Sequence, residues 1–240
     1  MTAAVLANNL WVLLCGLFVF MMTIAVGFLE VGELGERVAG SLVKTILITG
    51  LAVLVMAMVG FNTAFAPTSL GGIIGNPLYG PGLFLGGFSP GIADSWWSVA
   101  GAGLRTGTYF LFETAFASVT LALVGVVALH KMKLSAFAIY SVVYFVLIWA
   151  LPAAWIWNPS GWLAKLGMVD FAGGLVVHGA AGAAGLGIVW QIWREEKAKG
   201  HKVSPPVPYR VNTGWLTIAI LLLWVGWFGF NPGSVLAFND

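Results

Sequence analysis

Long uninterrupted apolar runs are the feature that most limits what this chain can fold into. The hydrocarbon core of a bilayer is about 30 Å thick, so a helix needs about 20 apolar residues to cross it. Six runs of this kind occur, at residues 10–29, 42–64, 104–129, 134–153, 171–193 and 215–236. A membrane β-barrel would need strands of alternating polarity, which these runs do not show. The sequence therefore predicts an all-α integral membrane protein, a polytopic bundle of about six transmembrane helices.

Composition supports this fold class and excludes a soluble domain. Hydrophobic residues make up 60% of the 240 residues and charged residues only 8%, whereas soluble domains are about 25% charged. The net charge of +2 is too small to indicate a nucleic-acid partner. The lipid bilayer is thus an expected partner and nucleic acid is not. The single cysteine, Cys15, lies inside the first run, and we interpret it as a small apolar filler.

Residues 1–240 form a single predicted transmembrane domain, in which a hydrophilic linker at 194–212 separates five helices from the sixth. Pro205, Pro206 and Pro208 favour an extended chain in this linker. No basic residue precedes the first run, so we expect a retained helix and not a cleaved signal peptide.

The stretch 67–103, between the second and third runs, is rich in Gly and Pro. It predicts an irregular loop, with Trp96 and Trp97 at the level of the lipid headgroups.

The positions of Lys and Arg in the short loops predict the orientation, because basic loops stay cytoplasmic. Lys131 and Lys133 follow the third run, and the linker after the fifth run is also basic. We therefore expect both connections on the cytoplasmic side of a cell membrane and the N-terminus outside. The loop expected after the first run mixes acids with bases and adds little: it holds Glu30, Glu33, Glu36, Arg37 and Lys44.

Three ionisable residues fall in or beside the apolar runs, where each costs at least about 2.5 kcal/mol. Asp170 directly precedes the fifth run, at the position of a helix N-cap. We predict that its carboxylate caps this helix, and attraction of a cation is compatible with that role. Glu113 lies between Phe112 and Phe116, which share a helix face that excludes it. Glu113 either ties two helices together or attracts a cation.

His178 lies near the middle of the fifth run, eight residues after Asp170. A neutral imidazole at that depth needs a polar partner or a polar cavity, which favours a functional role. Its neighbours are small, which permits close helix contact or an open lumen. No co-ligand is spaced along the run, so we predict no metal site.

Two motifs carry a resemblance to a known family. The stretch from Asp170 to His178 (DFAGGLVVH) and the stretch from Gly226 to Ser234 (GWFGFNPGS) resemble the two signatures of the ammonium transporter (Amt/Rh) family. Pro232 in the second motif also predicts a helix break. Shorter similarities at 59–61, 113–117, 133–136 and 162–164 extend the resemblance over most of the chain from residue 50 onward.

The resemblance implies the eleven-helix fold of this family, a homotrimer in which each subunit encloses a pore between two inverted repeats. Residues 1–193 would be the first five-helix repeat, 194–212 a cytoplasmic linker and 213–240 the first helix of a truncated second repeat. We expect this chain to be a fragment or half of a two-part assembly. Alone, it would leave Glu113 and the other membrane-depth ionisable groups facing lipid.

The resemblance also implies roles for individual residues, by their position in the motifs. Trp157, Ser234 and Phe112 would line an outer vestibule that binds ammonium. Asp170 would support this vestibule. Phe116 and Phe230 would be the rings that close the vestibule. His178 would be a pore histidine that relays a proton.

Some residues depart from the family pattern. Glu113 stands where the family commonly has Gln, as in the Rh branch, and residues 28–33 replace a Phe-Tyr-Gly-Gly pattern. A one-residue insertion near 158–161 leaves open whether Trp157 or Trp155 lines the vestibule.

The predicted function is therefore transport of ammonium or ammonia. The alternatives are an ammonium sensor, which needs a cytoplasmic output segment, and a neutral gas or water channel of the same fold. We predict no enzyme, because no nucleophile–base pair is apparent, and no cofactor. A cytoplasmic regulatory protein is a candidate partner.

Overall fold

The computed structural model describes residues 2–35, 37–79, 103–128, 132–201 and 211–238. Within these residues, six helical spans are long and apolar enough to cross a membrane, which confirms the predicted number. The spans are Ala3–Leu34, Val38–Phe65, Thr106–Ala128, Leu134–Ile156, Gly174–Ala198 and Thr213–Gly233. The all-α class is therefore confirmed, and the chain is a multi-pass membrane protein.

Three spans are single helices: α1 (Ala3–Leu34), α4 (Thr106–Ala128) and α9 (Thr213–Gly233). The second span joins α2 (Val38–Val55), the π-helical turn η1 (Met56–Gly60) and α3 (Phe61–Phe65). The fourth joins α5 (Leu134–Val143), η4 (Tyr144–Ile148) and α6 (Ala150–Ile156). The fifth joins η5 (Gly174–Gly179) and α8 (Ala180–Ala198), and a short helix α7 (Trp162–Lys165) precedes it. Single π-helical turns of this kind often occur at functional sites.

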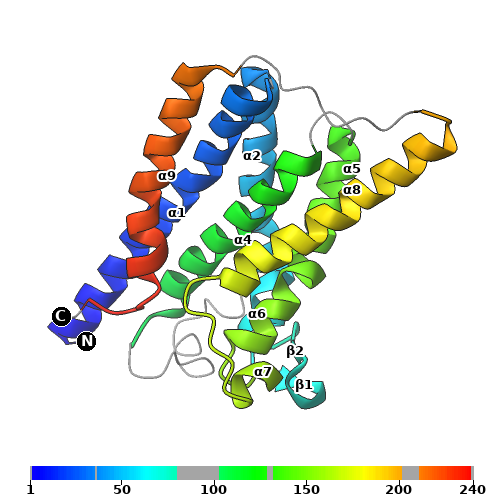
Figure 1. The fold of residues 1–240 in the computed structure, drawn as a ribbon. Helices are drawn as coiled ribbons and strands as arrows, with labels where there is room; N and C mark the ends of the chain where they lie inside the picture. The colour runs from blue at the N-terminus through cyan, green and yellow to red at the C-terminus, as the bar shows by residue number, and fades with distance from the viewer. Residues whose placement is uncertain (1, 36, 80–102, 129–131, 202–210, 239–240) are drawn as a thin grey trace.

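Helix α1 packs along both α4 and α9, whereas α8 packs on α4 and projects from the bundle at its C-terminal end (Figure 1). Two glycines allow α9 to approach α1 closely, as small residues do at helix contacts in membranes. A Cβ atom at Gly229 would lie 2.6 Å from the carbonyl oxygen of Cys15, and one at Gly233 would lie 2.6 Å from Cys15 Cβ. Cys15 is fully buried at this contact, which confirms its role as a filler.

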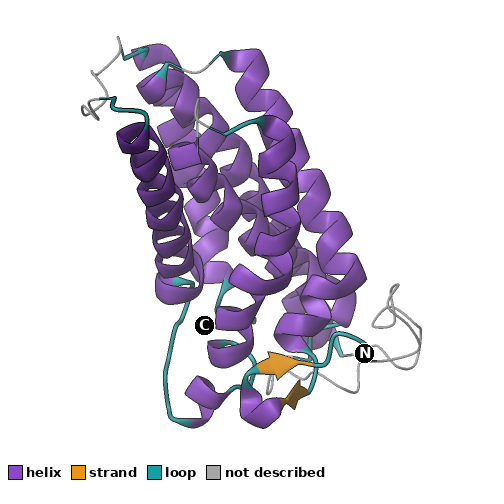
Figure 2. Ribbon diagram, turned by 90° about the vertical axis from the view of Figure 1, so that its right-hand side faces the viewer, coloured by secondary structure: helices purple, strands orange, loops and turns teal. Residues whose placement is uncertain are grey.

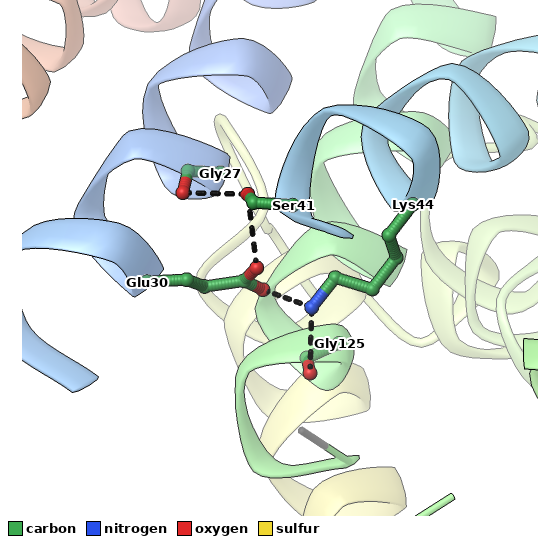
Figure 3. Close-up of polar contacts among 5 residues, drawn as sticks. All are labelled: Gly27, Glu30, Ser41, Lys44 and Gly125. Carbon is green, nitrogen blue, oxygen red and sulfur yellow. Dashed lines mark hydrogen bonds and ion pairs between the residues drawn. The ribbon is translucent and has the colours of Figure 1, made fainter. Parts of the chain in front are cut away.

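A buried polar cluster joins α1, α2 and α4 (Figure 3). Lys44 Nζ lies 2.5 Å from Glu30 Oε1 and donates to the carbonyl oxygen of Gly125 at 3.3 Å. Ser41 Oγ lies 2.7 Å from the carbonyl oxygen of Gly27 and 3.3 Å from Glu30 Oε2. The expectation of a loop at Glu30 and Lys44 was wrong, because both lie within helices, with Glu30 only 1% exposed.

The connections differ in part from the expected loops. Residues 67–79 contain a small antiparallel sheet of β1 (Thr68–Ser69) and β2 (Ile74–Gly75), with the 3-10 turn η2 (Leu70–Gly72) between the strands. Figure 2 shows these strands at the same end of the bundle as the two termini. At the linker, α8 continues to Ala198, so its first residues are helical. Several expectations lie outside the described residues: those for Trp96, Trp97, Lys131, Pro205, Pro206 and Pro208.

Candidate functional site

An aromatic column forms where α4, the end of α6 and the end of α9 meet. The ring centroids of Phe112 and Phe116 are 4.7 Å apart, and those of Phe116 and Phe230 are 4.5 Å apart with an interplanar angle of 34°. The ring of Trp157 meets Phe116 edge-on, with centroids 5.8 Å apart. The structure thus brings together four side chains that the sequence analysis named from separate segments.

The two candidate vestibule tryptophans occupy different places. Trp157 contacts Phe116, and its indole N–H donates to the carbonyl oxygen of Asp170 at 2.7 Å. Trp155 instead donates to the carbonyl oxygen of Ile73 at 2.7 Å, and its ring lies 6.2 Å from that of Trp162. Of the two rings, Trp157 therefore belongs to the aromatic column and Trp155 supports the loop at residues 67–79.

Asp170 organises the start of the fifth span. Its two carboxylate oxygens accept hydrogen bonds of 2.7 to 2.8 Å from four successive backbone N–H groups, those of Gly173, Gly174, Leu175 and Val176. These N–H groups have no partner within the helix, so the carboxylate satisfies them and complements the positive helix end. The predicted capping role is confirmed. The helix itself begins later than predicted, because Gly173 has a φ of 103° that no helix continues.

Ser234 lies directly after α9, one turn beyond Phe230. Its hydroxyl donates to the carbonyl oxygen of Phe230 at 2.7 Å. A hydroxyl that donates its proton to the backbone keeps lone pairs with which it accepts other hydrogen bonds. The predicted helix break occurs here, since α9 ends at Gly233 with Pro232 in its last turn.

His178 lies beside two aromatic rings of α9. Its ring centroid lies 6.1 Å from that of Phe230 and 6.3 Å from that of Trp227, to which it is nearly parallel at 13°. The imidazole is exposed and lines an open cavity of about 400 Å³ between α4 and α8, with Leu123, Val127, Ala181, Gly182, Gly185 and Leu186 among its neighbours. Gly182 borders this open space, whereas Gly185 lies in close contact with Val127 of α4.

Glu113 lies in α4 between Phe112 and Phe116 and is only 4% exposed. Its carboxyl group is hydrogen-bonded to Tyr109, one turn earlier in α4, so this bond stays within one helix and does not tie two helices together. Glu113 does not face lipid, contrary to expectation. Within the described part of the chain, Glu113 Oε2 and Trp149 Nε1 are buried without a hydrogen-bond partner.

Three residues of this region were missed by the sequence analysis. Trp149 is fully buried, and its ring lies 6.3 Å from that of Trp157. Trp227 was treated only as part of an aromatic motif, although its spacing from Phe230 places the two rings on one helix face. Tyr109 shares its helix face with Glu113, four residues on, and that spacing was the available signal.

Comparison with known proteins gives a consistent result. Residues 10–240 match the Ammonium Transporter Family. The ammonium transporter Amt1 of Archaeoglobus fulgidus is 32% identical over 235 residues, which cover 97% of this chain and 54% of that protein. A putative ammonium transporter of Synechocystis is 33% identical and covers 96% of this chain and 49% of that protein.

Solved structures show the same fold. The crystal structure of Saccharomyces cerevisiae Mep2 superposes with a TM-score of 0.74 at 24% identity, over 97% of this chain and 50% of that chain. A structure titled "Sensor Amt Protein" gives a TM-score of 0.78 over 98% of this chain and 56% of that one. The chain therefore spans about half the length of the relatives that it matches. By sequence and by fold, it belongs to the ammonium transporter family.

Proposed function

We propose that this chain captures ammonium at an outer vestibule and passes ammonium or ammonia along a path that contains His178. The stack of Phe116 on Phe230 is the observation that carries this proposal, because it connects Trp157, whose ring contacts Phe116, with His178, whose ring lies beside Phe230. The Trp157 indole attracts cations, and the two stacked rings connect it to the His178 imidazole. This arrangement suits a substrate that is captured as a cation.

The vestibule offers ammonium two kinds of contact. A cation over an indole face gains up to about 2 kcal/mol when it is desolvated. The Ser234 oxygen accepts a hydrogen bond from ammonium while its own proton stays on the Phe230 carbonyl oxygen. Asp170 contributes by position, since its backbone carbonyl oxygen holds the Trp157 ring.

The stacked rings of Phe116 and Phe230 and the imidazole of His178 determine how the positive charge of ammonium is treated along the path. An ammonium ion that leaves water for an apolar path loses hydration worth many kcal/mol, so shedding or relaying the proton lowers the barrier. His178 is the titratable group next to the gate ring Phe230, and a neutral imidazole nitrogen accepts a proton. We assign the proton relay to His178.

The working unit is proposed to be a homotrimer in the cell membrane, with the N-terminus of this chain outside and a cytoplasmic regulatory protein as a candidate partner. Residues 1–193 correspond in this proposal to the first inverted repeat. The open side of His178 is then covered by further helices of the working transporter.

The two tryptophans provide the test. Trp157→Leu should raise the half-saturating ammonium concentration about tenfold in proteoliposomes, by the loss of a cation–π contact. Trp155→Leu is the matched control, since it removes an indole of similar position in the sequence without touching Phe116. Absence of ammonium flux above that of empty vesicles, measured with this chain assembled with the further helices of the working transporter, would reject transport. Saturable ammonium binding without flux would instead favour the ammonium sensor.

A further inference from the structure

Two tryptophans and two basic residues share one face at the C-terminal end of α8. Trp190 is 59% exposed and Trp193 is 41% exposed. Arg194 Cζ lies 5.3 Å from the centroid of the Trp190 ring, and Lys197 Nζ lies 4.8 Å from that of the Trp193 ring. Each pair is four residues apart, which is the spacing that brings side chains together on a helix. We refer to these four residues as the Trp–cation face.

The order of these residues along the helix follows the order of groups in a phospholipid. The fifth span runs from Gly174 to Ala198. A helix crosses the hydrocarbon core in about 20 residues, so a core that begins at Gly174 ends near Trp193. Indole rings concentrate at the headgroup level. Basic side chains one turn further extend to the level of the phosphates while their stems stay on apolar surface.

The acidic residues nearby do not neutralise this face. Glu195 accepts a hydrogen bond from Gln191 at 2.9 Å. Glu196 pairs with Lys199 at 3.2 Å and with His201 at 2.8 Å. Between residues 132 and 201, no ion pair joins a carboxylate to Arg194 or Lys197, so the face presents two positive charges beside two apolar rings.

We propose that the Trp–cation face binds an anionic phospholipid of the cytoplasmic leaflet. The phosphate lies between Arg194 and Lys197, and the acyl chains run along the two exposed indoles. A guanidinium matches the oxygens of a phosphate with two parallel hydrogen bonds. Charge complementarity selects an anionic headgroup, and the apolar rings on the bilayer side of the charges select a lipid over an acidic protein segment.

The test measures binding of two defined lipids to the full chain purified in detergent, by native mass spectrometry. Phosphatidylglycerol should bind more tightly than phosphatidylcholine. Each basic residue near an anionic headgroup is worth about fivefold in affinity at low salt. Arg194→Gln with Lys197→Gln should therefore weaken phosphatidylglycerol binding about 25-fold and leave phosphatidylcholine binding unchanged.

The matched control replaces two basic residues that lie just beyond the same helix end and outside the Trp–cation face. Lys199→Gln with His201→Gln should change the affinity for phosphatidylglycerol less than about twofold, because these residues pair with Glu196. A salt titration of the unmodified chain adds a measurement that needs no variant: phosphatidylglycerol affinity should fall with ionic strength and phosphatidylcholine affinity should not. No preference for phosphatidylglycerol in the unmodified chain would overturn the proposal, as would equal losses in both double variants. An unchanged preference in Arg194→Gln with Lys197→Gln would assign the lipid to another surface.

Discussion

The indole N–H of Trp157 donates a 2.7 Å hydrogen bond to the backbone carbonyl oxygen of Asp170, whose carboxylate caps the start of η5. One residue thus holds a ring of the aromatic column with its backbone and begins the helix of His178 with its side chain. The aromatic column and the start of the helix that carries His178 are therefore linked through Asp170.

Substitution of Asp170 by Asn should damage both parts. An amide offers one acceptor oxygen, whereas the carboxylate accepts from four N–H groups, so the loss of capping should cost about 2 kcal/mol. We expect a lower melting temperature in detergent and collapse of ammonium uptake in vesicles. Normal uptake by a well-folded Asp170→Asn protein would refute the proposed role.

Substitution of His178 by Ala should act on function and hardly on stability. The imidazole is exposed and its ring centroid lies 6.3 Å from that of Trp227 and 6.1 Å from that of Phe230, so its removal leaves the aromatic column in place. We expect loss of ammonium current in proteoliposomes, with a melting temperature close to that of the unmodified chain. An unchanged, ammonium-selective current would show that His178 is a packing residue.

The Glu30–Lys44 pair should behave as a buried ion pair. Lys44→Met leaves the Glu30 carboxylate buried without its cation, which typically costs 3 to 5 kcal/mol, about the effect expected here. Glu30→Leu combined with Lys44→Met removes both charges and should recover most of that loss. Thermal unfolding in detergent measures each term of this double-mutant cycle. Additive losses of the two single variants would contradict coupling between the side chains.

The contact of α9 with α1 should depend on Gly229. An added Cβ would lie 2.6 Å from both the Cys15 carbonyl oxygen and Phe18 Cβ, so Gly229→Ala must push the helices apart. We expect a loss of about 1–3 kcal/mol, as for overpacking. Gly187→Ala on α8 is the matched control, because nothing lies within 4 Å of its added Cβ. Equal melting temperatures for both variants would mean that α1 and α9 are not in contact at Gly229.

Local features of the chain predicted much of this protein. The six spans followed from apolar runs, because a bilayer admits only helices of a minimum length. The capping role of Asp170 was predicted because a cap acts on N–H groups a few residues away. The π-helical turns and the late start of the fifth span were not, because they depend on small backbone adjustments that hydropathy does not record.

The sequence by itself determined that the chain enters a membrane and to which family it belongs. Both conclusions depend on the length of apolar runs and on two short motifs, which involve only residues close together in the sequence. Only the tertiary structure decided which residues meet. It placed Phe230 on Phe116, chose Trp157 over Trp155 for the aromatic column and buried Glu30 against Lys44. Hydropathy records how strongly a residue prefers lipid to water, whereas these contacts depend on which faces of distant helices pack together.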